Sequence, residues 1–153
     1  MMGIDRIDRK ILRCLAADGR RSWRELANDI GLSLTPTMRR VKRLEDDGYI
    51  MGYHAQLNEA LISGAVSAYV FVTLESQAKE RLVVFEREIA QAPQVMSCFQ
   101  MTGDFDYILR VVVSDLNSYQ QFLTETLTSI PGVSHIESSF SLKTVLHRLV
   151  PLL

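Results

Sequence analysis

The chain has 153 residues, of which 47% are apolar and 23% charged, enough for one medium-sized domain or two small ones. This composition excludes a disordered or collagen-like protein. No stretch approaches the roughly 18 uninterrupted apolar residues of a membrane span, and charged residues stand near the N-terminus where a secretion signal needs an apolar core. We therefore expect a soluble, cytoplasmic protein. Cys14 and Cys98 lie in apolar runs without further ligands at metal-binding spacing, so both are expected in the core.

The net charge of -1 conceals an asymmetry along the chain. Residues 1–54 hold 11 lysines and arginines against 8 aspartates and glutamates, whereas residues 55–153 hold 6 against 10. A basic segment favours a polyanionic partner, and an acidic one does not. If the protein binds nucleic acid, the first third of the chain is expected to bind it.

Three short helices are predicted in that basic third. Residues 4–17 carry apolar side chains at helical spacing and end at an Asp-Gly pair. The second helix, within residues 22–31, begins with a capping box of Ser22 and Glu25 and ends at a glycine. The third extends over residues 33–48 after a tight turn. This arrangement predicts a helix-turn-helix.

The third helix decides whether such a unit binds DNA. Its N-cap is expected to be Ser33, with Thr35 on the exposed surface. At about 100° per residue, one face is expected to be buried and the other to be cationic. The residues predicted for the buried face are Leu34, Met38, Val41 and Leu44, and the cations are Arg39 and Arg43 on the outer face with Arg40 and Lys42 on the flanks. Arginine on such a helix can read guanine in the major groove.

A plainer interpretation is a solvated helix whose charges pair with one another. Lys42 with Asp46 and Arg43 with Asp47 have the i,i+4 spacing, and each pair contributes only a few tenths of a kcal/mol. The position of the cations on the helix that enters DNA in a helix-turn-helix favours nucleic-acid binding instead.

Beyond the helices, residues 49–57 predict a short strand or wing around Gly52, and residues 58–64 predict a hinge. The apolar period then changes to two, with alternate residues from Val66 to Leu74 on one face. Helices that end before Pro93 and at Pro131 separate the remaining predicted strands, which are 95–101, 107–113 and 133–142. The order βαββαβ predicts a ferredoxin-like sandwich, so that the whole chain is α+β.

A four-stranded sheet covered by helices on one face leaves the other face bare. Here that face would carry aromatic and apolar side chains, among them Tyr69 and Phe71. We expect a second copy of the chain to cover it. Such a homodimer would present two recognition helices to half-sites about 34 Å apart, or a multiple of that distance.

Motifs in both halves resemble the Lrp/AsnC (feast/famine) transcriptional regulators over essentially the whole chain. The stretches that carry the resemblance are residues 5–12, 30–33, 35–37, 39–45, 48–50, 52–53, 103–107 and 130–133. The resemblance implies a winged helix-turn-helix at 1–57, a hinge at 58–64, and a domain at 65–153 that binds an effector and forms dimers, often octamers made of four dimers. In many members an amino acid binds between dimers. Asn58-Glu59-Ala60 departs from the common Asn-Pro, which predicts a more flexible linker.

The loop Gly103-Asp104-Phe105-Asp106 has two interpretations. Glycine and aspartate are usual in β-turns. A second carboxylate and an aromatic ring exceed what a turn needs, and carboxylates and backbone N–H groups can hold an amino acid's ammonium and carboxylate. By resemblance the loop lies in the family's effector site. All four residues are therefore candidate effector contacts, with Thr126 and Thr128 as weaker ones.

Enzymatic motifs are not found in the sequence. It has no glycine-rich phosphate loop, no His-Glu-x-x-His and no Gly-x-Ser-x-Gly, and His54, His135 and His147 are scattered. We expect a DNA-binding regulator that is not an enzyme and needs no metal or cofactor. The alternative is a small-molecule-binding regulatory module whose helical domain docks on a protein.

Overall fold

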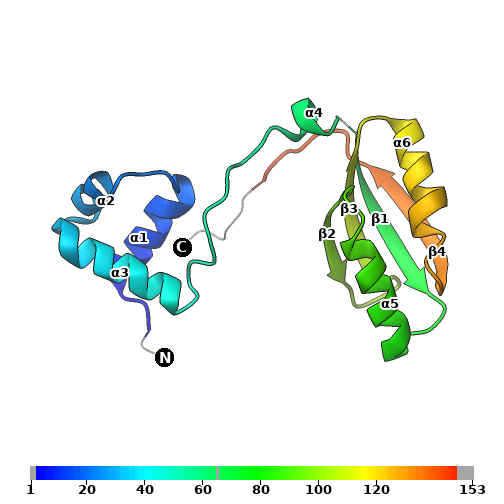
Figure 1. Cartoon of the computed structure of the whole chain (residues 1–153), viewed down its shortest axis with the longest axis horizontal. Coiled ribbons are helices and arrows are strands. Elements are labelled where there is room, and N and C mark those ends of the chain that lie inside the picture. The colour runs from blue at the N-terminus through cyan, green and yellow to red at the C-terminus, as the bar shows by residue number, and fades with distance from the viewer. Residues whose placement is uncertain (1–2, 65, 148–153) are drawn as a thin grey trace. The chain divides into compact units, whose positions relative to one another are not determined.

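The computed structural model describes residues 3–64 and 66–147, which form two compact units (Figure 1). One unit holds the N-terminal helices up to Gln56, and the other spans Leu57–Val145.

The first unit consists of three helices, α1 (Arg6–Ala17), α2 (Trp23–Ile30) and α3 (Leu34–Asp46). The predicted capping box at the start of α2 is confirmed, because the Ser22 hydroxyl accepts from the Glu25 N–H and the Glu25 carboxylate accepts from the Ser22 N–H. Gly31, at φ +76°, ends α2 in the left-handed conformation that glycine adopts without strain and allows the tight turn into α3. The buried core joins all three helices through Ile11, Leu26, Ile30, Val41 and Leu44.

The rotation of α3 about its axis differs from the prediction. Leu34 and Met38 are 42% and 44% exposed, so their expected burial is wrong, and Thr37 is fully buried instead. Thr37 can be buried because its hydroxyl donates to the Ser33 carbonyl within the first turn. Ser33 stands at the N-cap position, but its side chain makes no capping hydrogen bond, contrary to expectation.

The segment after α3, for which the sequence predicted a short strand or a wing over residues 49–57, forms no strand in the described structure. The N–H groups of Tyr49 and Ile50 both bond the Leu44 carbonyl, which turns the chain back onto α3. Ile50 packs on the helical core, whereas Met51 is 97% exposed. A strand needs a paired neighbour, and none is found in the described part of this unit.

Residues 58–64, expected as a flexible hinge, contain one helical turn, α4 (Glu59–Ile62). The Glu59 carboxylate accepts two hydrogen bonds from the Arg110 guanidinium in strand β3 (Tyr107–Val113). This ion pair ties the start of the second unit to its sheet.

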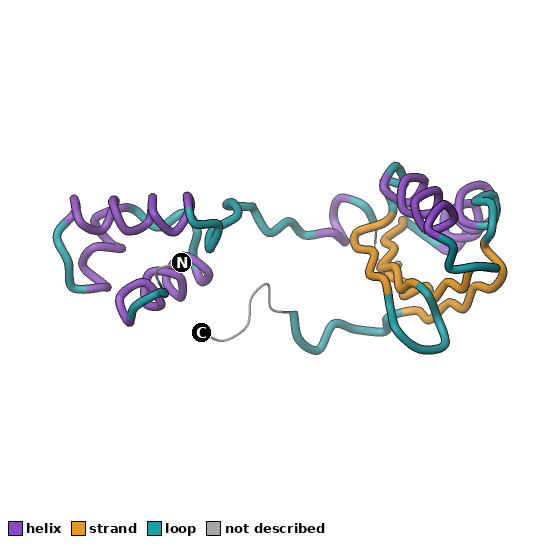
Figure 2. The backbone as a smooth tube through the Cα atoms, turned by 90° about the horizontal axis from the view of Figure 1, so that it is seen from below, coloured by secondary structure: helices purple, strands orange, loops and turns teal. Residues whose placement is uncertain are grey.

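The second unit has the predicted βαββαβ order. Besides α4 and β3, its elements are β1 (Val66–Leu74), α5 (Lys79–Ala90), β2 (Val95–Gln100), α6 (Leu116–Gln121), η1 (Phe122–Leu127) and β4 (Val133–Phe140). The four strands form an antiparallel sheet in the order β2-β3-β1-β4, which helices cover on one face (Figure 2). The final helix continues from α6 into η1, a wider π-type turn, before the last strand.

The two faces of the sheet differ as the period of two predicts. Ala68, Val70 and Val72 of β1 are fully buried in the core beneath the helices. On the opposite face, Tyr69 is 41% exposed and Phe99 is 60% exposed.

The prediction that both cysteines are buried is wrong, because Cys14 is only half-buried and Cys98, on the edge strand β2, is exposed.

Candidate functional site

The exposed face of α3 forms a continuous stripe that includes two apolar residues and two cations. Successive turns of a helix bring positions i, i+1, i+4, i+5 and i+8 onto one face. The exposed residues with this spacing, called the α3 stripe below, are Leu34, Thr35, Met38, Arg39 and Lys42. Neither Arg39 nor Lys42 has an ion-pair partner within the described residues.

Arg40 and Arg43 of α3 do not belong to this stripe. The Arg40 guanidinium donates to Asp5 at 2.7 Å and to Asp8 at 2.8 Å, and Arg43 donates to Asp8 at 2.5 Å. Arg43, one turn after Arg39, keeps 38% of its side chain exposed, but its guanidinium is paired within the described residues, unlike that of Arg39. The Arg43 guanidinium points at Asp8 of α1 instead.

The first turn of α1 builds the acidic half of this contact. Asp5 caps α1 by accepting from the Asp8 N–H, and Asp8 accepts from the Asp5 N–H in return. The backbone hydrogen bond from Asp8 and the side-chain hydrogen bond from Arg40 lower the pKa of Asp5 to about 2. Asp8 is buried to 1% exposure. The sequence reasoning missed its role, although the Asp5-to-Asp8 spacing is that of a capping box.

The plainer interpretation of α3 as a solvated helix predicts charge pairs along its surface. Among the described residues, neither Lys42 with Asp46 nor Arg43 with Asp47 forms an ion pair. The stripe thus keeps its cations free beside exposed apolar side chains, which is unusual for a surface helix that only meets water.

In the second unit, the loop between β2 and β3 packs against the end of β1. Asp106 is 7% exposed, and its two carboxylate oxygens accept from the Leu74 N–H and the Gln77 side chain, each at 2.7 Å. The Phe105 ring contacts Phe71, with the ring centroids 5.1 Å apart. Both oxygens of Asp106 are therefore occupied by the protein's own donors, so Asp106 holds the loop rather than offering a free carboxylate.

The tip of the same loop is open. Gly103 has φ +117°, and nothing lies within 4 Å of the position its Cβ would take. The N–H groups of residues 102–105 have no hydrogen-bond acceptor among the described residues. The Asp104 side chain also has no partner there, and only its backbone carbonyl accepts from Thr73. One free carboxylate thus stands beside several free N–H donors.

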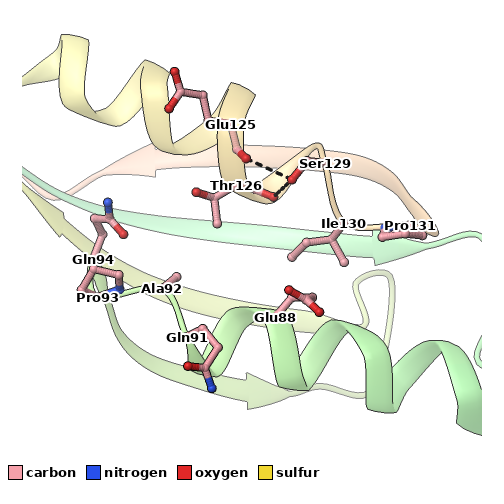
Figure 3. A pocket seen from close by; sticks show the side chains of 10 residues that line it. All are labelled: Glu88, Gln91, Ala92, Pro93, Gln94, Glu125, Thr126, Ser129, Ile130 and Pro131. Carbon is pink, nitrogen blue, oxygen red and sulfur yellow. Dashed lines mark hydrogen bonds between the residues drawn. The ribbon is translucent and has the colours of Figure 1, made fainter.

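The two threonines predicted as weaker effector contacts lie elsewhere. Thr126 lines a hollow of about 430 Å³ between the end of α5 and the end of η1 (Figure 3). No residue of the 103–106 loop lines this hollow. The Thr128 hydroxyl donates to the Thr124 carbonyl of its own helix. The structure therefore brings neither threonine to the loop.

The described ranges, 3–64 and 66–147, bear on two other kinds of site. No group of three or more His, Cys, Asp or Glu side chains there could hold a metal ion. None of the helices in these ranges is long and apolar enough to cross a membrane.

Comparison with known proteins identifies both units. Residues 4–51 match the family model described as winged helix-turn-helix DNA-binding, and residues 67–151 match the Lrp/AsnC ligand binding domain. The chain is 62% identical over 151 residues to the Bkd operon transcriptional regulator of Pseudomonas aeruginosa, covering 99% of each chain. It is 40% identical over 131 residues to the leucine-responsive regulatory protein of Escherichia coli, covering 86% of this chain and 80% of the relative.

Solved structures agree with these matches. A transcriptional regulator of Neisseria meningitidis in complex with L-Met superposes with a TM-score of 0.93 at 36% identity, over 98% of this chain and 97% of the other. An AsnC family regulator from Agrobacterium tumefaciens gives a TM-score of 0.92 at 34% identity, over 97% of each chain. The chain therefore belongs to the Lrp/AsnC family and is a DNA-binding transcriptional regulator with an effector-binding domain.

Proposed function

We propose that the α3 stripe makes the sequence-specific contacts to operator DNA. Arg39 reads guanine, Thr35 contacts a base edge, and Lys42 contacts a phosphate. Ser33, at the N-terminus of α3 with a hydroxyl not used as a cap, donates to another phosphate. Arg40 and Arg43 take no part in these contacts because Asp5 and Asp8 hold them.

The observation that carries this proposal is the mixed character of the stripe. The side chains of Leu34 and Met38 are more than 40% exposed, although α3 also has a buried face on which apolar side chains could lie. In the major groove, apolar side chains meet the methyl group of thymine, while arginine meets guanine. The stripe therefore suits an operator half-site that contains both thymine and guanine.

The target proposed for this regulator is a Bkd operon. The support is the 62% identity to the Bkd operon transcriptional regulator over nearly the full length of both chains.

Because operator DNA is the partner, the protein acts in the cytoplasm. Its regulatory activity requires DNA and an effector, with neither catalysis nor a metal cofactor.

The effector proposed is an apolar α-amino acid bound at the tip of the 103–106 loop. Asp104 takes the ammonium group, and the free N–H groups of residues 102–105 take the carboxylate. Asp106 and Phe105 hold the loop in place. The amino-acid class comes from the names of the relatives, one leucine-responsive and one solved with L-Met.

The proposed assembly is a homodimer through the open face of the sheet, with four dimers joining into an octamer. The support is the exposure of Tyr69 and Phe99 on a face that no helix covers. A two-fold dimer presents two α3 stripes to two half-sites.

Gel-shift titration of the full chain against DNA from upstream of a bkd operon, with unrelated DNA as competitor, tests the proposed function. Arg39→Ala is expected to cost about 1–3 kcal/mol of operator discrimination. Arg87→Ala, which removes an exposed arginine of the second unit, is the matched control and should leave operator binding unchanged. Equal operator affinity for wild type and Arg39→Ala would contradict the assignment of the stripe.

Calorimetric titration with L-leucine and L-methionine tests the effector site. Asp104→Asn should abolish the binding heat and the ligand's effect on DNA affinity, because the ammonium group loses its charged partner. Unchanged binding by Asp104→Asn would place the ligand elsewhere in the domain.

A further inference from the structure

A neutral ion cluster joins the start of α1 to the middle of α3. The Asp8 carboxylate accepts from Arg40, from Arg43 and from the Asp5 N–H, and Asp5 gives Arg40 a second carboxylate. Two carboxylates thus face two guanidinium groups. Neither arginine is a free cation, although both stand on the helix that reads DNA.

Burial makes Asp8 the centre of this cluster. Its side chain is 1% exposed, whereas the side chains of Arg40 and Arg43 are 26% and 38% exposed. Removing a carboxylate from water costs free energy of hydration, which charged partners must offset. Asp8 therefore binds both guanidinium groups tightly, and they in turn keep part of their surface near solvent.

The same bonds fix the rotation of α3. Arg40 lies on the flank of α3 next to the buried Val41 and Leu44, and Arg43, one turn after Arg39, lies beside the α3 stripe with its guanidinium turned to Asp8. A guanidinium group bonds in a fixed planar geometry. Turning α3 about its axis would break these bonds, so the bonds keep the stripe directed outward.

We propose that Asp8 is a positioning residue for operator recognition, which holds Arg40 and Arg43 off the DNA phosphates and fixes the rotation of α3. This inference rests on the proposed role of the α3 stripe. Non-specific binding to DNA comes almost entirely from cations on phosphates. Withholding two arginines from the phosphates lowers the affinity for every sequence alike and makes the salt slope shallower. The fixed rotation of α3 raises the ratio of specific to non-specific binding, because it keeps the α3 stripe in place for operator contacts that other DNA does not offer.

Asp8→Asn tests the proposal with the least change in shape. Asparagine keeps an oxygen that can accept from the Asp5 N–H, but the cluster gains one positive charge and Arg43 loses its charged partner. On non-operator DNA, the slope of log K against log salt should become steeper by about 0.9 for each new phosphate contact, or about 1.8 for a dimer. Affinity for non-operator DNA should rise about tenfold at low salt. The operator to non-operator ratio should fall at least about fivefold, because α3 is no longer held in the rotation that presents the stripe.

Two further variants isolate the cause. Asp8→Asn combined with Arg43→Gln restores neutrality and should return the slope to the wild-type value. Asp47→Asn also removes one negative charge, at the end of α3, from a side chain without a partner in the described structure. It should leave the slope within about 0.3 of wild type, because it frees no cation.

Far-UV circular dichroism and the fluorescence of Trp23, the single tryptophan, establish whether each variant is folded. If Asp8→Asn does not fold, Asp5→Asn decides the question. Asparagine remains a good N-cap, and the Asp5 side chain is about half exposed, so this variant should fold while it frees part of the charge on Arg40. Its slope should change in the same direction by a smaller amount.

A steeper slope that Arg43→Gln reverses, together with a lower ratio, supports the proposal. A folded variant with the wild-type slope and ratio overturns it. An equal loss of affinity for both DNAs at unchanged slope also overturns it, since Asp8 would then serve only the fold. Failure of wild type to bind any DNA, or an Arg39→Ala variant with full operator affinity, would instead contradict the proposed function itself.

Discussion

Asp106→Ala is expected to lower the free energy of unfolding of the second unit by about 2–3 kcal/mol. The lost carboxylate accepts from the Leu74 N–H and from Gln77, both at 2.7 Å. Leu74 is 6% exposed, so its N–H would stay buried without an acceptor, whereas Gln77 is exposed and can turn to water. A hydrogen bond to a charged group contributes about 1.5–3 kcal/mol, and an orphaned buried donor costs about 1–3 kcal/mol.

Thermal unfolding of the full chain followed by far-UV circular dichroism measures this loss. For a domain of this size it corresponds to a fall of about 10–20 °C in the Tm of the second unit. The fluorescence of Trp23 follows the helical unit and should keep its transition. Asp104→Ala, on the same loop but without a side-chain partner in the described structure, is the matched control and should stay within about 0.5 kcal/mol of wild type. Equal stability of the Asp106→Ala and Asp104→Ala variants would refute the reasoning.

Three other perturbations test separate parts of the structure. Gly64→Ala should destabilise the second unit by at least about 2 kcal/mol in chemical unfolding, because its φ is +109° and a Cβ would lie 2.2 Å from the Cα of Ser114. The depressed pKa of Asp5 stabilises the folded helical unit above the unfolded value of about 4, and this contribution should disappear as pH falls toward about 2. Trp23 fluorescence during acid titration should therefore show a smaller pH dependence for Asp5→Asn than for wild type. Burial and the hydrogen bond to Glu45 raise the pKa of Tyr53 to about 12, so Tyr53→Phe should remove a late step from the alkaline absorbance titration of the tyrosines.

Local patterns were sufficient for most of the secondary structure. The alternation of apolar residues predicted β1, and the run from Tyr107 to Val113 forms β3 within the predicted bounds. The capping box at Ser22 and the glycine at the end of α2 set the start and end of that helix. These features depend on neighbours in sequence, which is why they could be predicted from sequence.

The strand expected at residues 49–57 shows where such reasoning fails. β-forming side chains raise the tendency to be extended, but a strand exists only when another segment pairs with it. The prediction for Cys98 failed for a related reason. The apolar run around it does become a strand, but the order β2-β3-β1-β4 puts that strand at an edge of the sheet.

By itself the sequence determined the two-part organisation, the order of helices and strands, the basic DNA-binding third and the loop at residues 103–106, because periodicity, caps and charge are local properties. Only the tertiary structure decided which charged groups are free. Asp8 meets Arg43 across 35 positions of the chain, and Asp106 meets Leu74 across 32. A charged side chain can bind DNA, bind a ligand or stabilise the fold. Which of these it does depends on the partner that the folded chain brings within 3 Å, and neither a helical wheel nor a turn motif can identify a partner that is distant in sequence.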